Sequence, residues 1–85
     1  MKKREAVLIY MELLSSLLDG PKGPTRLAQA CNVNYGRIEG FTGPLLRKGL
    51  IRSAVTDGQE TFSITEEGAR VYEEWLGIWR RLPLD

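Results

Sequence analysis

The sequence predicts a mainly helical domain with one small β-hairpin (an α+β fold), in the order helix, helix, helix, hairpin, helix. Three observations support this prediction. The chain has 85 residues, which is the size of one small domain, so residues 1–85 are predicted to form a single domain. Apolar residues recur with helical spacing near both ends of the chain. An Asp57-Gly58 pair, which is typical of a tight hairpin turn, separates two short segments in the second half.

The first helix is predicted from its apolar content and its stop signal. Apolar residues at helical spacing fill residues 4–18 without an intervening proline or glycine, which indicates a helix within residues 1–19. Asp19-Gly20-Pro21 ends it, because glycine accepts the left-handed cap conformation and proline cannot continue a helix. Thr25 is then the candidate N-cap of a short second helix over residues 26–31.

A third helix follows after a tight turn that Asn32 suits. Asn34 is its candidate N-cap, and the helix is predicted from Tyr35 to Lys48. Gly49 provides the C-terminal stop. Residues 25–49 therefore form two helices joined by a short turn.

The helical spacing of apolar residues ends at Gly49. Residues 50–64 contain two short segments on either side of the Asp57-Gly58 turn, which predicts a hairpin. Thr65 is the candidate N-cap of the last helix, residues 65–82, whose first turn carries two glutamates that oppose the helix dipole favourably. Pro83 ends this helix.

Composition and charge exclude several classes of protein. The chain has no histidine and one cysteine, Cys31, and it has no Gly-rich phosphate loop, so we expect no enzyme activity, no metal site and no cofactor. Residues 1–54 hold nine Lys or Arg against four Asp or Glu, whereas residues 55–85 hold three against seven. A net charge of +1 therefore conceals a basic front half that can face a polyanion.

Three stretches of the sequence carry a family resemblance. These are Asn-Val-Asn-Tyr at 32–35, Leu-Leu-Arg-Lys-Gly-Leu-Ile at 45–51 and Phe-Ser-Ile-Thr-Glu-Glu-Gly-Ala at 62–69. Together they resemble the winged helix-turn-helix of archaeal-type transcriptional regulators and of small dimeric chromatin proteins, over roughly residues 5–76. The resemblance implies that the third helix enters the major groove of DNA, that the hairpin forms the wing, and that the last helix mediates dimerisation.

The exposed face of the third helix differs from that of the family it resembles, which usually carries polar and basic side chains that read base edges. A helical wheel of about 100° per residue places one apolar group toward the core: Ile38, Phe41, Thr42, Leu45 and Gly49, with Leu46 at the edge. The opposite side holds Gly36, Gly40, Gly43 and Arg47, flanked by Arg37, Pro44 and Lys48. Pro44 is expected to kink or break the helix. Either the glycines merely accommodate a short or kinked helix, or they let a DNA backbone or a partner helix approach closely.

The candidate DNA contacts follow from the wheel and the resemblance: Arg26, Tyr35, Gly36, Arg37, Gly40, Gly43, Arg47, Lys48 and Arg52. Each side chain has a structural alternative. Tyr35 could pack on the second helix, Arg37 could be a solvated surface residue, and Arg47 and Lys48 suit a helix C-terminus. Lys2, Lys3 and Arg4 are either a basic arm or a solubilising chain end. The predicted wing tip carries Asp57 and no basic residue, so its role in binding is expected to be slight.

The last helix carries a broad apolar stripe made of Val71, Tyr72, Trp75, Ile78, Trp79 and Leu82, which Leu76 extends. Aromatic residues are enriched at interfaces, so the stripe predicts a homodimer contact. The alternative is that Trp75 completes the core and Trp79 covers the first helix.

The leading functional hypothesis is a DNA-binding regulator or chromatin-associated protein that binds duplex DNA as a homodimer. The alternative is a winged-helix module that binds other proteins and not DNA. The longest apolar run, residues 6–11, is too short to span a bilayer, and no cleavable signal is apparent, so a cytoplasmic location is expected, with nucleoid association if the protein binds DNA. No small-molecule ligand is predicted.

Overall fold

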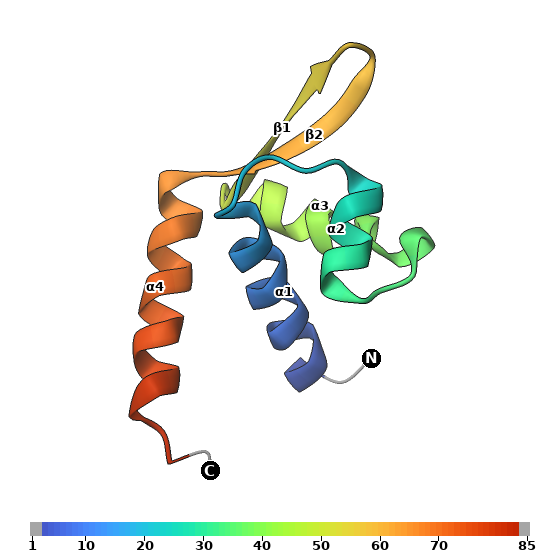
Figure 1. Ribbon diagram of the computed structural model, residues 1–85. Helices are drawn as coiled ribbons and strands as arrows, with labels where there is room; N and C mark the ends of the chain where they lie inside the picture. Colours follow the sequence, from blue (N-terminus) through green and yellow to red (C-terminus); the bar gives the residue numbers. More distant parts are fainter. Residues whose placement is uncertain (1–2, 84–85) are drawn as a thin grey trace.

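The computed structural model describes the backbone of residues 3–83 and the side chains of residues 5–83. The predicted order of elements is confirmed (Figure 1). The elements are α1 (Lys3–Leu17), α2 (Pro24–Cys31), a 3-10 turn η1 (Tyr35–Arg37), α3 (Glu39–Arg47), β1 (Ile51–Thr56), β2 (Gln59–Ile64) and α4 (Glu66–Arg81).

The core lies where α1, α2 and α3 meet the base of the hairpin. Its buried apolar members are Leu13, Leu14, Leu17, Leu27, Ala28, Cys31, Ile38, Phe41, Leu45, Ile51 and Phe62. No side chain of α4 belongs to this buried set, although Tyr72 packs against it. Helix α4 therefore lies beside α1 as an outer element, and it runs in the opposite direction (Figure 1).

The hairpin projects away from the helices (Figure 1). β1 and β2 are antiparallel and pair from Ile51 opposite Ile64 to Thr56 opposite Gln59. Asp57 and Gly58 have φ angles of 53° and 77°, so both turn residues are left-handed, as a type I′ turn requires. At its base, Phe62 also exchanges two backbone hydrogen bonds with Lys22, of 3.0 and 2.8 Å. The loop after α1 thus contributes one bridge to the sheet, which the sequence did not predict.

The predicted start of α2 at residue 26 is wrong by two residues, and its predicted cap at Thr25 is wrong. Gly23 is the N-cap, Pro24 is the first helical residue, and no side chain caps the helix. Proline suits that position, because its fixed φ is helical and its missing N–H would have no intrahelical acceptor. Thr25 therefore lies inside the helix. The predicted turn at Asn32 is confirmed by its left-handed backbone, with φ 55° and ψ 43°.

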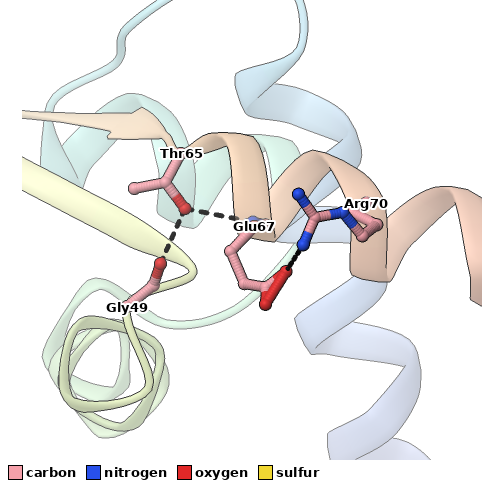
Figure 2. Close-up of polar contacts among 5 residues, drawn as sticks. Gly49, Thr65, Glu67 and Arg70 are labelled. Atoms are coloured by element: carbon pink, nitrogen blue, oxygen red, sulfur yellow. Dashed lines mark hydrogen bonds and ion pairs between the residues drawn. The ribbon is translucent and has the colours of Figure 1, made fainter.

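A polar junction joins α3, the hairpin and α4 (Figure 2). Gly49 has a φ of 71°, and the N–H groups of Gly49 and Leu50 donate to Leu46 and Leu45, which is a Schellman motif that ends α3. The Thr65 hydroxyl donates to the Gly49 carbonyl at 2.6 Å and accepts from the Gly68 N–H at 3.0 Å. The predicted N-cap at Thr65 is therefore confirmed, and the same side chain ties α4 to the end of α3.

The packing around Gly68 explains why the stretch Thr-Glu-Glu-Gly at residues 65–68 contains a glycine. A Cβ atom at this position would lie 2.0 Å from the carbonyl oxygen of Leu50 and 2.9 Å from a side-chain carbon of Ile64. Only a residue without a side chain lets the first turn of α4 pack this closely on the start of the hairpin.

Candidate nucleic-acid interface

The segment predicted as one helix from Tyr35 to Lys48 consists of two parts. Its first turn is the 3-10 turn η1, in which the Arg37 N–H donates to the Asn34 carbonyl at 2.8 Å and the Ile38 N–H donates to the Tyr35 carbonyl at 3.2 Å. The predicted cap at Asn34 is confirmed, since its side chain accepts from the Gly36 N–H at 2.8 Å. This local bond and the low helix propensity of Gly36 favour the tighter turn. The α-helix begins at Glu39.

Pro44 does not break this helix, contrary to one of the two expected effects. Pro44 lies inside α3, which continues to Arg47. Proline has no N–H to donate to the Gly40 carbonyl, so that helical bond is missing. Helix α3 has nine residues, because η1 replaces its first predicted turn and the Schellman motif at Gly49 ends it.

Burial confirms the predicted core face of this helix except at Gly49, which lies past the end of α3 and is exposed. Ile38, Phe41, Thr42 and Leu45 are each at most 6% exposed. On the opposite side Gly36, Gly40 and Arg47 are exposed and Gly43 is half-buried. A Cβ atom at Gly40 would have no atom within 4 Å, whereas one at Gly43 would lie 3.4 Å from Nη1 of Arg47. The Arg47 guanidinium therefore lies beside Gly43, at one end of the glycine stripe, defined as Gly36, Gly40 and Gly43.

Arg37 lies against the body of the domain and is not simply solvated. Its guanidinium carbon is 5.9 Å from the centroid of the Phe41 ring, within the range of a cation–π contact. The Phe41 ring in turn meets Tyr10 of α1 edge-on, with centroids 5.6 Å apart. Gly36 and Gly40 line a shallow hollow of about 440 Å³ beside these residues. Part of the glycine stripe therefore borders α1.

Tyr35 is 60% exposed and lies beside α2, where it lines a groove together with Ala28 and Gln29. It lines a cleft of about 220 Å³ between the start of α2, the start of α3 and strand β2. Glu39 and Glu60 line the same cleft. Neither carboxylate was predicted from the sequence, although the wheel places Glu39 beside the core face and the strand alternation places Glu60 on the face of Phe62.

The remaining predicted cations lie around α3 on three elements. Arg26 is exposed in the first turn of α2 and lines a groove of about 530 Å³ together with Glu60 and its neighbours on β2. Lys48 is the exposed C-cap of α3, and Arg52 is exposed on β1 opposite Ser63. The side chains of Lys2, Lys3 and Arg4 lie outside the described residues.

The apolar stripe of α4 is partly covered and partly open. Tyr72 packs against the core, and the rings of Tyr72, Trp75 and Trp79 stack in sequence, with centroids 6.5 and 4.9 Å apart. Tyr72 and Trp75 line a groove of about 340 Å³ against α1. Beyond it, Ile78, Trp79 and Leu82 are 59, 42 and 49% exposed. The C-terminal half of the stripe is therefore open to solvent.

Reactive and metal-ligating side chains are few in the part of the chain that the structure describes. Burial raises the pKa of the Cys31 thiol to about 11, and the carboxylate of Glu12 adds to the rise. Such a thiol is a poor nucleophile. No group of three or more metal-ligating side chains occurs among residues 5–83. None of the described helices is long and apolar enough to cross a membrane.

A sequence model described as winged helix-turn-helix matches residues 3–80. The chain belongs to the winged helix-turn-helix family. The resemblance drawn from the three sequence stretches is thereby confirmed, and the hairpin β1–β2 is the wing of this winged helix. No curated protein matches the chain by sequence.

Solved structures show the same fold at low sequence identity. The transcriptional regulator BldR from Sulfolobus solfataricus superposes with a TM-score of 0.78 and 23% identity, over 85% of this chain and 54% of BldR. The winged helix therefore spans about half of that protein. Sso10a-2, a DNA-binding protein from the same organism, has a TM-score of 0.71 and 20% identity, over 94% of this chain and 83% of its own. The homodimeric winged helix-turn-helix DNA-binding domain Mb0332 from Mycobacterium bovis has a TM-score of 0.75 and 18% identity, over 85% and 68%.

Proposed function

We propose that this winged helix binds duplex DNA, as a transcriptional regulator or a chromatin-associated protein. The observation that carries the proposal is a set of exposed cations on α2, η1, the C-terminal end of α3 and β1: Arg26, Arg37, Arg47, Lys48 and Arg52. Exposed cations of this kind bind DNA by neutralising backbone phosphates, and the release of counterions supplies a large share of the affinity.

The exposed face of α3 determines how this DNA would be read. The glycine stripe places backbone where other helices carry base-reading side chains, so the helix can approach a groove closely. Tyr35, at the N-terminal end of the segment, and Arg47, beside Gly43, are its side chains for direct contact. With so few such side chains, we expect phosphate contacts to outweigh base readout and sequence specificity to be modest.

The proposal includes a homodimer formed through α4. The interface residues are Val71, Tyr72, Trp75, Ile78, Trp79 and Leu82, of which the last three named are the most exposed. A two-fold dimer would present two α3 helices to successive major grooves, about 34 Å apart on a palindromic site. This role corresponds to a cytoplasmic, nucleoid-associated protein with no cofactor and no catalytic activity.

Fluorescence anisotropy with a mixed-sequence duplex at several salt concentrations tests the proposal. We expect binding that weakens steeply with salt, and we expect Arg37→Ala and Arg47→Ala each to reduce the slope by about one counterion. Arg70→Ala is the matched control, since Arg70 is an exposed arginine on α4 that pairs with Glu67. Absence of binding even at low salt would contradict the proposal.

The second candidate is a winged helix that binds another protein and not DNA. The observation in its favour is the pair of exposed carboxylates, Glu39 and Glu60, on the cleft beside Tyr35, where they repel phosphate. Tight self-association or capture of a protein, with no affinity for the duplex at any salt concentration, would establish this candidate in place of the first.

A further inference from the structure

The narrow cleft beside the wing is lined by two carboxylates and, among the described residues, by no cation. It has a volume of about 220 Å³ and lies between the start of α2, the start of α3 and strand β2. Its carboxylates belong to Glu39 and Glu60, which are both exposed. No hydrogen bond or ion pair of the described side chains involves either of them. The cleft therefore presents negative charge to a cation from outside the chain.

A buried hydroxyl opens into the same cleft. Thr42 lines the cleft and is only 2% exposed, and no hydrogen bond among residues 5–83 involves its side chain. In this part of the chain, every side-chain oxygen or nitrogen that is completely shielded from solvent has a hydrogen-bond partner. The Thr42 hydroxyl has none, so it reaches solvent through the cleft that it lines. A buried polar group without a protein partner is normally satisfied by a ligand or by water.

The size and the lining of the cleft favour a single side chain as its occupant. Its volume is below the roughly 300–1,000 Å³ of a pocket that encloses a drug-sized ligand. Ile38 and Phe62 supply buried apolar surface, and Tyr35 supplies an exposed aromatic ring. An arginine matches this lining, because its methylene stem packs on apolar surface, its guanidinium stacks on aromatic rings, and its N–H donors suit carboxylate and hydroxyl oxygens.

We propose that this cleft binds an arginine side chain of a partner protein, with Glu39, Glu60 and the Thr42 hydroxyl as acceptors for the guanidinium. The neighbouring groove shares Pro24 and Glu60 with the cleft but also contains Arg26, which repels a second cation. The partner segment therefore carries one arginine and not a basic run. A DNA base is a poorer match, since its phosphates would approach both carboxylates. The site goes beyond the proposed DNA binding and does not require that the chain lacks affinity for DNA.

NMR titration of the isotope-labelled chain with short peptides tests the proposal. The probe is a blocked alanine pentapeptide with a central arginine, and its control carries citrulline, which has the shape of arginine without the charge. We expect saturable shifts of the Gly36, Thr42 and Glu60 amide signals, and a Kd at least about tenfold higher for the citrulline peptide. Equal affinity for the two peptides, or no saturable shift at millimolar peptide, overturns the site. Shifts confined to α4 around Glu66 and Glu67 overturn it as well, because they report only general attraction to acidic residues.

Charge removal tests which side chains hold the guanidinium. Glu39→Gln and Glu60→Gln should each raise the Kd of the arginine peptide by about three- to tenfold, since each keeps the shape of the side chain and removes one charged acceptor. Glu73→Gln is the matched control, because Glu73 is exposed on α4 and does not line the cleft, and its Kd should stay within about twofold of the wild-type value. A Kd that neither cleft variant changes overturns the assignment.

The same variants distinguish arginine binding from the reading of a DNA base. If the arginine peptide does not bind and the two glutamine variants instead change the duplex sequence that the chain prefers, the cleft reads a base and the proposal is wrong. Anisotropy with the duplex decides DNA binding separately, so either proposal can fail while the other holds.

Discussion

Two regions of this winged helix use glycine for opposite reasons. At the junction between the wing and α4, Gly68 is buried, and a Cβ atom there would lie 2.0 Å from the Leu50 carbonyl oxygen. On the outer face of α3, a Cβ atom at Gly40 would meet no atom within 4 Å. The fold requires the glycine at position 68, but no contact within the described chain requires the one at position 40.

This difference indicates that the glycine at the junction has a structural role and that the glycine stripe has a functional one. The Thr-Glu-Glu-Gly signature at 65–68 is explained by packing and capping alone, since Thr65 and Gly68 both hold α4 against the end of α3 (Figure 2). The glycines of α3 lower its helix propensity by about 1 kcal/mol each and gain no packing in return at Gly40. Residues that lower stability and gain no packing contact are expected where a ligand approaches. We therefore assign the glycine stripe to the proposed interface.

The largest expected effect is at the junction. Gly68→Ala should lower the free energy of unfolding by about 3 kcal/mol or more, because the methyl group overlaps a backbone carbonyl that cannot move independently of the wing. Urea denaturation followed by circular dichroism measures this. Gly77→Ala in the same helix is the control, since a Cβ there meets nothing within 4 Å, and it should stabilise the chain by up to about 1 kcal/mol. Equal effects of the two variants would refute the packing explanation.

A smaller effect at the same junction separates capping from packing. Thr65→Ala removes the acceptor for the Gly68 N–H and the donor to the Gly49 carbonyl, so it should cost about 1–2 kcal/mol in thermal or urea unfolding. Thr65→Ser keeps the hydroxyl and should recover most of that loss. If serine destabilises as much as alanine, the methyl group of Thr65 matters and the two hydrogen bonds do not.

The smallest effect on stability is expected on the stripe. Gly40→Ala should leave the fold intact and raise the free energy of unfolding by up to about 1 kcal/mol, since its Cβ lies in open space. Gly40→Leu should also fold but should weaken DNA binding by about tenfold or more, because its side chain would hold the helix away from the groove. Unchanged affinity of the leucine variant for DNA and for a second copy would rule out close approach at this stripe.

Local signals in the sequence predicted most of the fold, and the failures share a cause. Thr65, Asn34, Gly49 and the Asp57-Gly58 turn were predicted correctly, because each acts on backbone groups within a few residues. Thr25 was a reasonable cap by residue type, but Pro24 beside it began the helix.

The start of α3 and the effect of Pro44 were not predicted correctly. Residue type alone did not show that the Asn34–Gly36 bond would tighten the first turn into η1, or that α3 would continue past Pro44 to Arg47. Of the candidate interface, the wheel correctly separated the buried from the exposed face of α3. It missed Glu39 and Glu60, because their proximity depends on how the wing packs against the helices.

The sequence by itself determined the order of the elements, the turn of the wing, the cap of α4 and the membership of the winged helix-turn-helix family, since these depend on local spacing and residue type. Only the tertiary structure decided which glycines are required and which are free. It also decided that α4 lies outside the core with its apolar stripe half open. These facts depend on distances between residues far apart in the chain, which no local pattern of side chains specifies.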